Sequence, residues 1–338
     1  MTWKIILPLA IVCCCISCKK NDRVKVQQYS YVLPGDQFFP EGIAYDRSTG
    51  VFYTGSTTSG DIVAVDVETG VASLFSSGAK AGRQAAIGMK LDAMDRLWVC
   101  GGTANFIQVL DKDGNVIKTW DTKALFNSGF VNDCIIVNGY IYFTDSQVRK
   151  IYRTRVTETL PGEMEEWLSF TDQQIPYGTG INANGIEATP DGKQLLVVIS
   201  NSGKLYRVNI ADKGISEIAL NTPVTSGDGL LTDGNTLYIS RNATGLIFPV
   251  TLNAGYSSGY VGAGFGENLI GNTTITRDAT HAPARRATQD PKWVRYVILA
   301  FGLTFLTVFL FVPLVAIFIE ALRGGLGAYF NALREPNA

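Results

Sequence analysis

The sequence predicts an all-β protein: a β-propeller of five full blades plus the start of a sixth, followed by a single C-terminal transmembrane α-helix. Three observations predict the propeller. One stretch recurs at a nearly constant interval, and each copy reads as several short strands. The repeats also lack the 3.6-residue apolar period of helices, which excludes a helical solenoid.

The clearest copy of the repeat covers residues 184–210. It predicts strands at residues 185–188, 194–199 and 204–209. The turns between them are Pro190-Asp191-Gly192 and Asn201-Ser202-Gly203. Proline presets one turn torsion and glycine accepts positive φ, so both tripeptides interrupt a strand. The other copies begin at Glu41, Ile87, Asn132 and Asp228, at intervals of 44 to 52 residues.

Composition sets further bounds. A hydrophobic content of 46% supplies a core, and 35 glycines suit a protein rich in turns. The net charge of −1 gives no reason to expect a nucleic-acid partner. Four of the six cysteines lie in the first 18 residues, so the body holds only Cys100 and Cys134. These two either form one bridge or remain buried free thiols.

The N-terminus predicts export. Residues 1–17 carry one charge, Lys4, before an apolar run that is too short to span a bilayer. The following C-I-S-C-K-K resembles a bacterial lipobox, which implies cleavage before Cys18 and acylation of its thiol. The alternative is an uncleaved anchor. Residues 18–37 are then a tether, with a possible closing strand at 29–33, and the propeller lies in the periplasm or at the cell surface, anchored to the lipid bilayer.

The propeller is predicted at residues 38–278. A sixth repeat begins at residues 272–278, with Thr273 at the expected interval, and then stops. Residues 279–296 read as a linker that holds His281, the only histidine. Residues 297–319 carry no charge, and at 1.5 Å per residue they measure about 34 Å, enough to cross a bilayer. A buried soluble helix is the alternative.

One repeat position is rich in oxygen ligands. Equivalent positions of propeller repeats surround a central channel, and this position reads Glu41, Ile87, Asn132, Asn184, Asp228 and Thr273. Four of these are carboxylates or amides, which suit a hard divalent cation such as Ca²⁺. Zinc is not expected, because the propeller has no histidine and its cysteines lie elsewhere. The alternative is that each residue forms a turn with its neighbouring glycine.

This pattern resembles the gluconolactonase/regucalcin family, whose distant relatives include the paraoxonases. The resemblance covers about residues 38–278 and rests on P-E-G at Glu41, V-N-D at Asn132, N-G at Asn184 and D-G at Asp228. It implies a six-bladed propeller with those four residues as ligands of Ca²⁺ or another divalent cation. It also implies hydrolysis of a lactone or small ester by metal-activated water, with the D-G aspartate as the base.

The residues present agree with that chemistry. Asp228 or Asp133 could accept the proton, and a Ser-His-Asp triad is excluded because the propeller lacks histidine. The alternative function is a surface lipoprotein that binds a sugar or metabolite without turnover.

Some cationic and aromatic residues keep two interpretations. The cationic side chains either contact an anionic substrate or are solvated turn charges: Lys90, Arg149, Lys150 and Arg153. The tryptophans either line a sugar site or pack between blades: Trp98, Trp120 and Trp167.

The tail carries a second resemblance. W-V-R-Y-V-I-L-A-F-G and V-P-L-V-A-I-F-I-E-A-L-R-G-G-L-G, within residues 282–338, look like the N-terminus of the W-type permease subunit of sulfate/thiosulfate ABC importers. Only the first membrane helix and the start of a periplasmic segment, residues 320–338, are matched. We therefore interpret the chain as a chimera of two fragments. A truncated permease fragment is a third functional interpretation, with ABC transporter subunits as partners only if the permease is intact.

Overall fold

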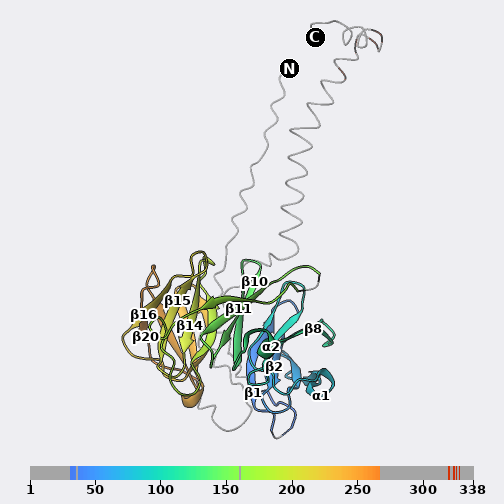
Figure 1. Ribbon diagram of the computed structural model, residues 1–338. Helices are drawn as coiled ribbons and strands as arrows, with labels where there is room; N and C mark the ends of the chain where they lie inside the picture. Colours follow the sequence, from blue (N-terminus) through green and yellow to red (C-terminus); the bar gives the residue numbers. More distant parts are fainter. Residues whose placement is uncertain are drawn as a thin grey trace, which may run out of the picture. The chain divides into compact units, whose positions relative to one another are not determined.

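The computed structural model describes residues 31–35, 37–159 and 161–266, and the single positions Ile319, Arg323, Gly325 and Gly327 (Figure 1). The chain divides into two compact units, Met1–Asp278 and Ala279–Ala338. Several predicted features lie outside the described residues: the signal peptide with Cys18, the sixth repeat with Thr273, the linker with His281, and residues 297–318. Within the described part, no helix has the length and apolar character needed to span a membrane.

Each of the first three blades is a four-stranded antiparallel sheet in simple chain order. Blade 1 contains β1 (Pro40–Asp46), β2 (Val51–Ser56), β3 (Ile62–Asp66) and β4 (Ala72–Ser76). Blade 2 contains β5 (Met89–Leu91), β6 (Leu97–Cys100), β7 (Phe106–Leu110) and β8 (Val116–Asp121). Blade 3 contains β9 (Val131–Val137), β10 (Tyr140–Asp145), β11 (Lys150–Arg155) and β12 (Glu165–Ser169).

The last two blades share their outer edge. Blade 4 contains β13 (Ala183–Ala188), β14 (Gln194–Ile199), β15 (Lys204–Asn209) and β16 (Ile215–Leu220). Blade 5 contains β17 (Gly227–Asp233), β18 (Thr236–Arg241), β19 (Leu246–Leu252) and β20 (Ser258–Val261). A short parallel pairing of β16 with β20, at Ala219 with Ser258 and Leu220 with Gly259, joins them into one eight-stranded sheet. The five four-stranded units match the number of full repeats in the sequence.

The clearest repeat folds as its residues predict. β14 and β15 have the predicted bounds, and β13 begins two residues before the predicted start. The turn before β14 has Gly192 at φ +66°, and the Asp191 carboxylate accepts hydrogen bonds from Thr189 Oγ1 (2.6 Å) and the Lys193 amide (3.1 Å). Local turn chemistry therefore sets this hairpin.

Short helices occupy some of the connections between strands. α1 (Gly78–Ala81) joins blades 1 and 2, and α2 (Thr122–Phe126) joins blades 2 and 3. The α2 N-cap is Asp121, whose side chain accepts a hydrogen bond from the Ala124 amide. In blade 5, the 3₁₀ turn η1 (Asn242–Thr244) follows β18.

The core lies between neighbouring blades. Separate clusters of buried side chains fill the interfaces of blades 1 and 2, 2 and 3, 3 and 4, and 4 and 5. Trp98, Trp120 and Trp167 are all buried within these clusters, so the packing interpretation of the tryptophans holds. Cys100 and Cys134 lie in the cluster between blades 2 and 3 as buried free thiols.

The segment before the first blade differs from its prediction. The sequence predicts a closing strand at residues 29–33; residues 31–33 form no strand, and residues 29 and 30 lie outside the described part of the chain. Instead Tyr31 and Leu33 are buried against Phe52 of blade 1, and Tyr31 Oη donates a hydrogen bond to the Val67 carbonyl (3.1 Å). The segment covers the apolar face of blade 1 that points away from blade 2, which outweighs strand pairing at this position.

Candidate functional site

A central cavity lies where the inner strands of the blades begin. Its volume is about 290 Å³. Its walls include five of the six positions of the sequence repeat: Glu41, Ile87, Asn132, Asn184 and Asp228. Residues from five different inner strands or their approaches thus meet in one place, although they are separated by up to 187 positions in the sequence. The sixth position, Thr273, lies outside the described residues.

Irregular strand pairing accompanies every one of the four polar positions. The register shifts between Glu41 and Ile43 in β1, between Ala183 and Ile186 in β13, and between Gly227 and Leu230 in β17. In blade 3 the shift occurs where β9 and β10 pair near Asn132. A bulge re-aims a side chain that regular alternation would send to the other face of the sheet. The bulges explain how four ladders can present a polar residue to the same cavity.

The glycines of the E-G and N-G dipeptides also have a packing role. A Cβ on Gly42 would lie 2.1 Å from the Ile87 carbonyl oxygen, and one on Gly185 would lie 2.0 Å from the Asp228 carbonyl oxygen. Consecutive inner strands therefore approach too closely for any side chain at these positions. The turn interpretation of these dipeptides is wrong, because they lie inside β1 and β13.

Two of the four candidate ligands are amides, Asn132 and Asn184. Asn184 is 5% exposed, and its buried Oδ1 has no hydrogen-bond partner among the residues that the structure describes. Asn132 donates its side-chain N–H to Ser146 Oγ (2.8 Å). An unpartnered buried acceptor costs about 1–3 kcal/mol, so it calls for a positive partner or a donor. A divalent cation in the cavity would supply that partner. The unpartnered Asn184 oxygen is therefore the feature of the described residues that fits a bound cation.

The two carboxylates at the cavity repel each other. Burial, followed by repulsion from Asp228 and Asp133, raises the pKa of Glu41 well above its usual value. Burial and repulsion from Asp133 raise the pKa of Asp228 to about 6, although hydrogen bonds from Asn184 and Asn242 oppose the change. No cationic side chain lies among the described residues that line the cavity, so its negative charge favours a cation.

Asp133 acts on the candidate ligands through its charge but is not one of the residues that line the central cavity. Its Oδ2 accepts a hydrogen bond from the Ile186 amide (3.2 Å). Burial raises its pKa, and the Lys90 ammonium partly offsets that effect. Lys90 lies in β5 and is mostly withdrawn from water, near Asp133 and Glu187, so it is not a solvated turn charge.

The donor set of the cavity is mixed. No cluster of three or more His, Cys, Asp and Glu side chains with metal-binding geometry occurs in the parts of the chain that the structure describes. The four residues at the cavity are two carboxylates and two amides, which together offer oxygen atoms alone. Such donors suit Ca²⁺ or Mg²⁺ rather than zinc.

The structure also shows lining residues that the repeat pattern does not identify. Thr57, Thr103 and Asn242 lie at the wall of the cavity, and Asn242 additionally bonds to Asp228. They come from connections between strands, whose lengths differ from blade to blade. The repeat period therefore gives no signal for them.

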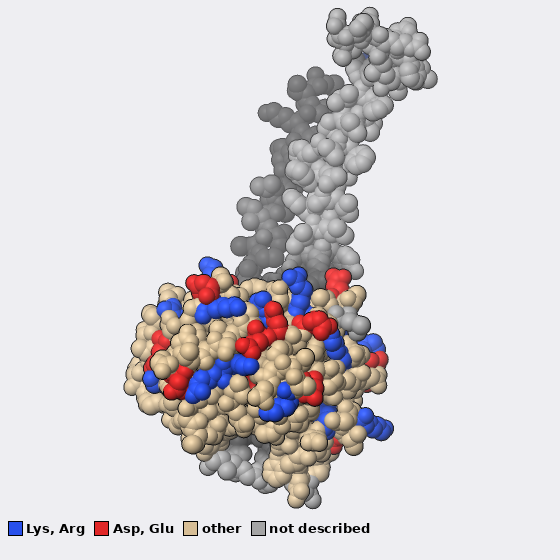
Figure 2. Space-filling view, in the orientation of Figure 1, with Lys and Arg blue, Asp and Glu red and all other residues tan. Residues whose placement is uncertain are grey.

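The predicted surface cations separate into two groups. Lys150 pairs with Glu166 at 2.7 Å and Arg153 pairs with Glu165 at 2.5 Å, both across β11 and β12. Arg149 instead lines a second cavity. On the visible face of the propeller, Lys and Arg side chains alternate with Asp and Glu (Figure 2).

Comparisons with known proteins identify the fold. No protein-family model matches the chain, and the search of curated proteins gave no match. Among solved structures, Mala s 1, the major allergen of Malassezia sympodialis, is 14% identical with a TM-score of 0.55, covering 71% of this chain and 83% of that one.

Two further solved structures are similar. A chain of the nidogen/laminin complex is 16% identical with a TM-score of 0.51, covering 66% of this chain and 79% of its own. The Cps50 (Swd1) β-propeller domain of Myceliophteria thermophila is 12% identical with a TM-score of 0.51, covering 71% of this chain and 75% of its own. At these identities the likeness concerns the fold alone, and together with the five four-stranded sheets it shows that the chain is a β-propeller.

Proposed function

We propose that the propeller binds a divalent cation, most simply Ca²⁺, in its central cavity and hydrolyses a lactone or small ester there. Glu41, Asn132, Asn184 and Asp228 would hold the cation. The observation that carries the proposal is that these four residues meet in one cavity, where the buried Asn184 oxygen has no partner from the described part of the chain. A bound cation would polarise the ester carbonyl and lower the pKa of a water molecule.

The chain's own residues would handle the proton. Asp228 lines the cavity, and a carboxylate with a pKa of about 6 is largely ionised at neutral pH yet basic enough to accept a proton. Asn184 and Asn242 hold that carboxylate in place through their hydrogen bonds. Asp133 is the second candidate base, and it would act only through an intervening water because it does not line the cavity.

The test combines calcium titration calorimetry with a lactone assay on the full-length chain. Glu41→Gln and Asp228→Asn should each weaken Ca²⁺ binding by at least about 10-fold, since even outer-shell changes at metal sites cost that much. Glu68→Gln, an exposed turn carboxylate, is the matched control and should bind Ca²⁺ as the wild type does. Because Glu41→Gln also relieves repulsion from Asp228, it should raise the unfolding midpoint of the calcium-free protein.

The outcomes separate the possible functions. Unchanged Ca²⁺ affinity in both variants would overturn the cation site. Calcium binding without hydrolysis of any tested lactone would reject the hydrolase proposal and support a protein that binds its ligand without turnover. Hydrolysis that is lost in Asp228→Asn even at calcium concentrations that saturate this variant, but kept in Asp133→Asn, would identify Asp228 as the base.

We also propose that Cys18 carries a lipid that tethers the propeller to a bilayer. The basis is the C-I-S-C sequence after an apolar leader. Expression of Cys18→Ser with radiolabelled palmitate should abolish lipid labelling, whereas Cys100→Ser should keep it. Equal labelling of Cys18→Ser and the wild type would refute the lipid anchor.

A further inference from the structure

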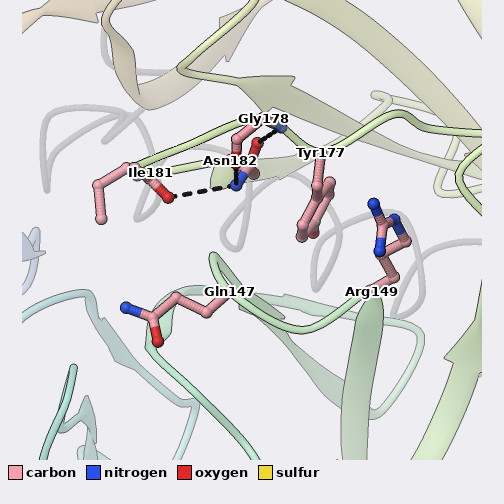
Figure 3. A pocket seen from close by; sticks show the side chains of 7 residues that line it. Gln147, Arg149, Tyr177, Gly178, Ile181 and Asn182 are labelled. Atoms are coloured by element: carbon pink, nitrogen blue, oxygen red, sulfur yellow. Dashed lines mark hydrogen bonds between the residues drawn. The ribbon is translucent and has the colours of Figure 1, made fainter.

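A second cavity opens beside the central one. Its volume is about 440 Å³, and it lies between the loop that joins β10 to β11 and the segment that leads from β12 to β13 (Figure 3). Ile181 lines both cavities. Both loops lie at the end of blades 3 and 4 where the inner strands begin, and the shared Ile181 makes the two cavities neighbours. We call the second cavity the rim cavity.

Internal hydrogen bonds hold one wall of the rim cavity. The Asp145 carboxylate is fully buried and accepts hydrogen bonds at 2.9–3.0 Å from four backbone amides and one hydroxyl. The donors are Gly129 N, Phe130 N, Gln147 N, Val148 N and Tyr152 Oη. This carboxylate fixes the β10–β11 loop without ligand, so binding would not have to order it.

The opposite wall is held in the same way. The Asn182 side chain accepts a hydrogen bond from the Gly178 amide (2.7 Å) and donates to the carbonyls of Ser146, Gly178 and Gly180. Tyr177 Oη donates to the Asp145 carbonyl (2.9 Å), which ties the two walls together. The cavity is therefore preformed by buried polar groups.

The groups that face the cavity are a cation, an aromatic ring and a carboxamide. The Arg149 guanidinium lies 5.1 Å from the centre of the Tyr177 ring and forms an ion pair with Asp172 (Figure 3). Its Nε has no hydrogen-bond partner among the described residues. Gln147 is exposed, and its side-chain amide lies across the cavity from Ile181 and Asn182 (Figure 3).

We propose that the rim cavity is a carboxylate-binding subsite for the molecule whose reacting carbonyl occupies the central cavity. A planar guanidinium on a side chain that is 35% exposed matches a carboxylate, and the Gln147 amide can donate to a neighbouring hydroxyl or carbonyl. Asp172 already neutralises part of the Arg149 charge, which favours a singly charged carboxylate over a doubly charged phosphate. The substrate class is thus a monolactone or monoester of a hydroxylated dicarboxylic acid, such as a sugar diacid, whose second carboxylate remains free to bind Arg149.

The link to a reacting carbonyl rests on the proposed function, but carboxylate binding can be tested separately. The full-length chain is titrated with D-glucuronate and with neutral D-glucose by calorimetry, with and without Ca²⁺. Wild-type protein should bind glucuronate more tightly than glucose under both conditions. Arg149→Gln should weaken glucuronate binding by about 10- to 100-fold, the size expected for loss of a charge-assisted hydrogen bond, and should leave glucose binding unchanged.

Two further variants keep the test decisive. Arg153→Gln is the matched control, because Arg153 lines neither cavity and pairs with Glu165. If Arg149→Gln does not fold, Gln147→Ala serves in its place. This truncation of an exposed side chain should weaken glucuronate binding, by a smaller factor. Equal binding of glucuronate and glucose, or equal loss in the Arg149 and Arg153 variants, would overturn the subsite. Loss of calcium binding or hydrolysis alone would count only against the proposed function.

Discussion

The inner strand of blade 4 and the inner strand of blade 1 share one sequence pattern but differ in their surroundings. Ile186 and Ile43 each follow the cavity residue by two positions. Ile186 is fully buried between blades 3 and 4, whereas Ile43 is 47% exposed. The second residue after the cavity residue therefore faces the preceding blade, and no described blade precedes blade 1.

Blade 5 shows the complementary difference. Ala44, three positions after Glu41, is 3% exposed against blade 2, whereas Leu231, three positions after Asp228, is 59% exposed. A Cβ added at Gly185 would lie 2.0 Å from the Asp228 carbonyl oxygen. A Cβ added at Gly229 would have Ser240 Oγ as its nearest neighbour, at 3.3 Å. Each blade is thus shaped to pack against a neighbouring blade on both sides. Among the described residues, blades 1 and 5 each pack against one neighbouring blade.

The largest expected effect is at the closest approach between blades. Gly185→Ala should cost about 3 kcal/mol or more of unfolding free energy, because its Cβ would meet backbone of β17 that cannot move aside independently. Gly229→Ala is the matched control at the open face and should change stability by less than about 1 kcal/mol. Urea unfolding of both full-length variants measures the difference. Similar losses in the two would contradict the packing account of the repeated glycine.

A smaller effect is expected at the matched isoleucines. Ile186→Ala should cost about 2–5 kcal/mol, because it leaves a cavity in the interface between blades 3 and 4. Ile43→Ala should cost less than about 1 kcal/mol, since its side chain is already half exposed. Thermal and urea unfolding provide the measurement. A loss of unfolding free energy for Ile43→Ala as large as that for Ile186→Ala would show that the face of blade 1 that carries Ile43 is packed in solution.

The smallest effect on stability is expected where the two open faces are made polar. The double variant Ile43→Thr, Leu231→Thr should leave the unfolding free energy within about 0.5 kcal/mol of the wild type. It should also lower self-association in sedimentation velocity, because exposed apolar side chains beside unpaired blades favour aggregation. Unchanged self-association together with a large loss of stability would mean that these side chains already have partners.

Much of this molecule follows from the repeat alone. The bounds of β14 and β15, the number of four-stranded units and the cavity position of Glu41, Asn132, Asn184 and Asp228 are all predictable, because equivalent positions of a repeat occupy equivalent places around one axis. The turn residues act locally, so they reveal the strand ends without tertiary information.

Other features depend on contacts between distant residues, and the sequence carries no local signal for them. The packing of the inner strands decides three such features: the bulges that aim the cavity residues, the position of Asp133 near Lys90, and the hydrogen bond from Asn242 to Asp228. Residues 31–33 have the composition of a strand, but burial of Tyr31 and Leu33 on blade 1 outweighs strand pairing. The rim cavity likewise exists because Asp145 and Asn182 fix two loops that are more than 30 residues apart in the chain, and hydrogen bonds over that separation form only in the folded state.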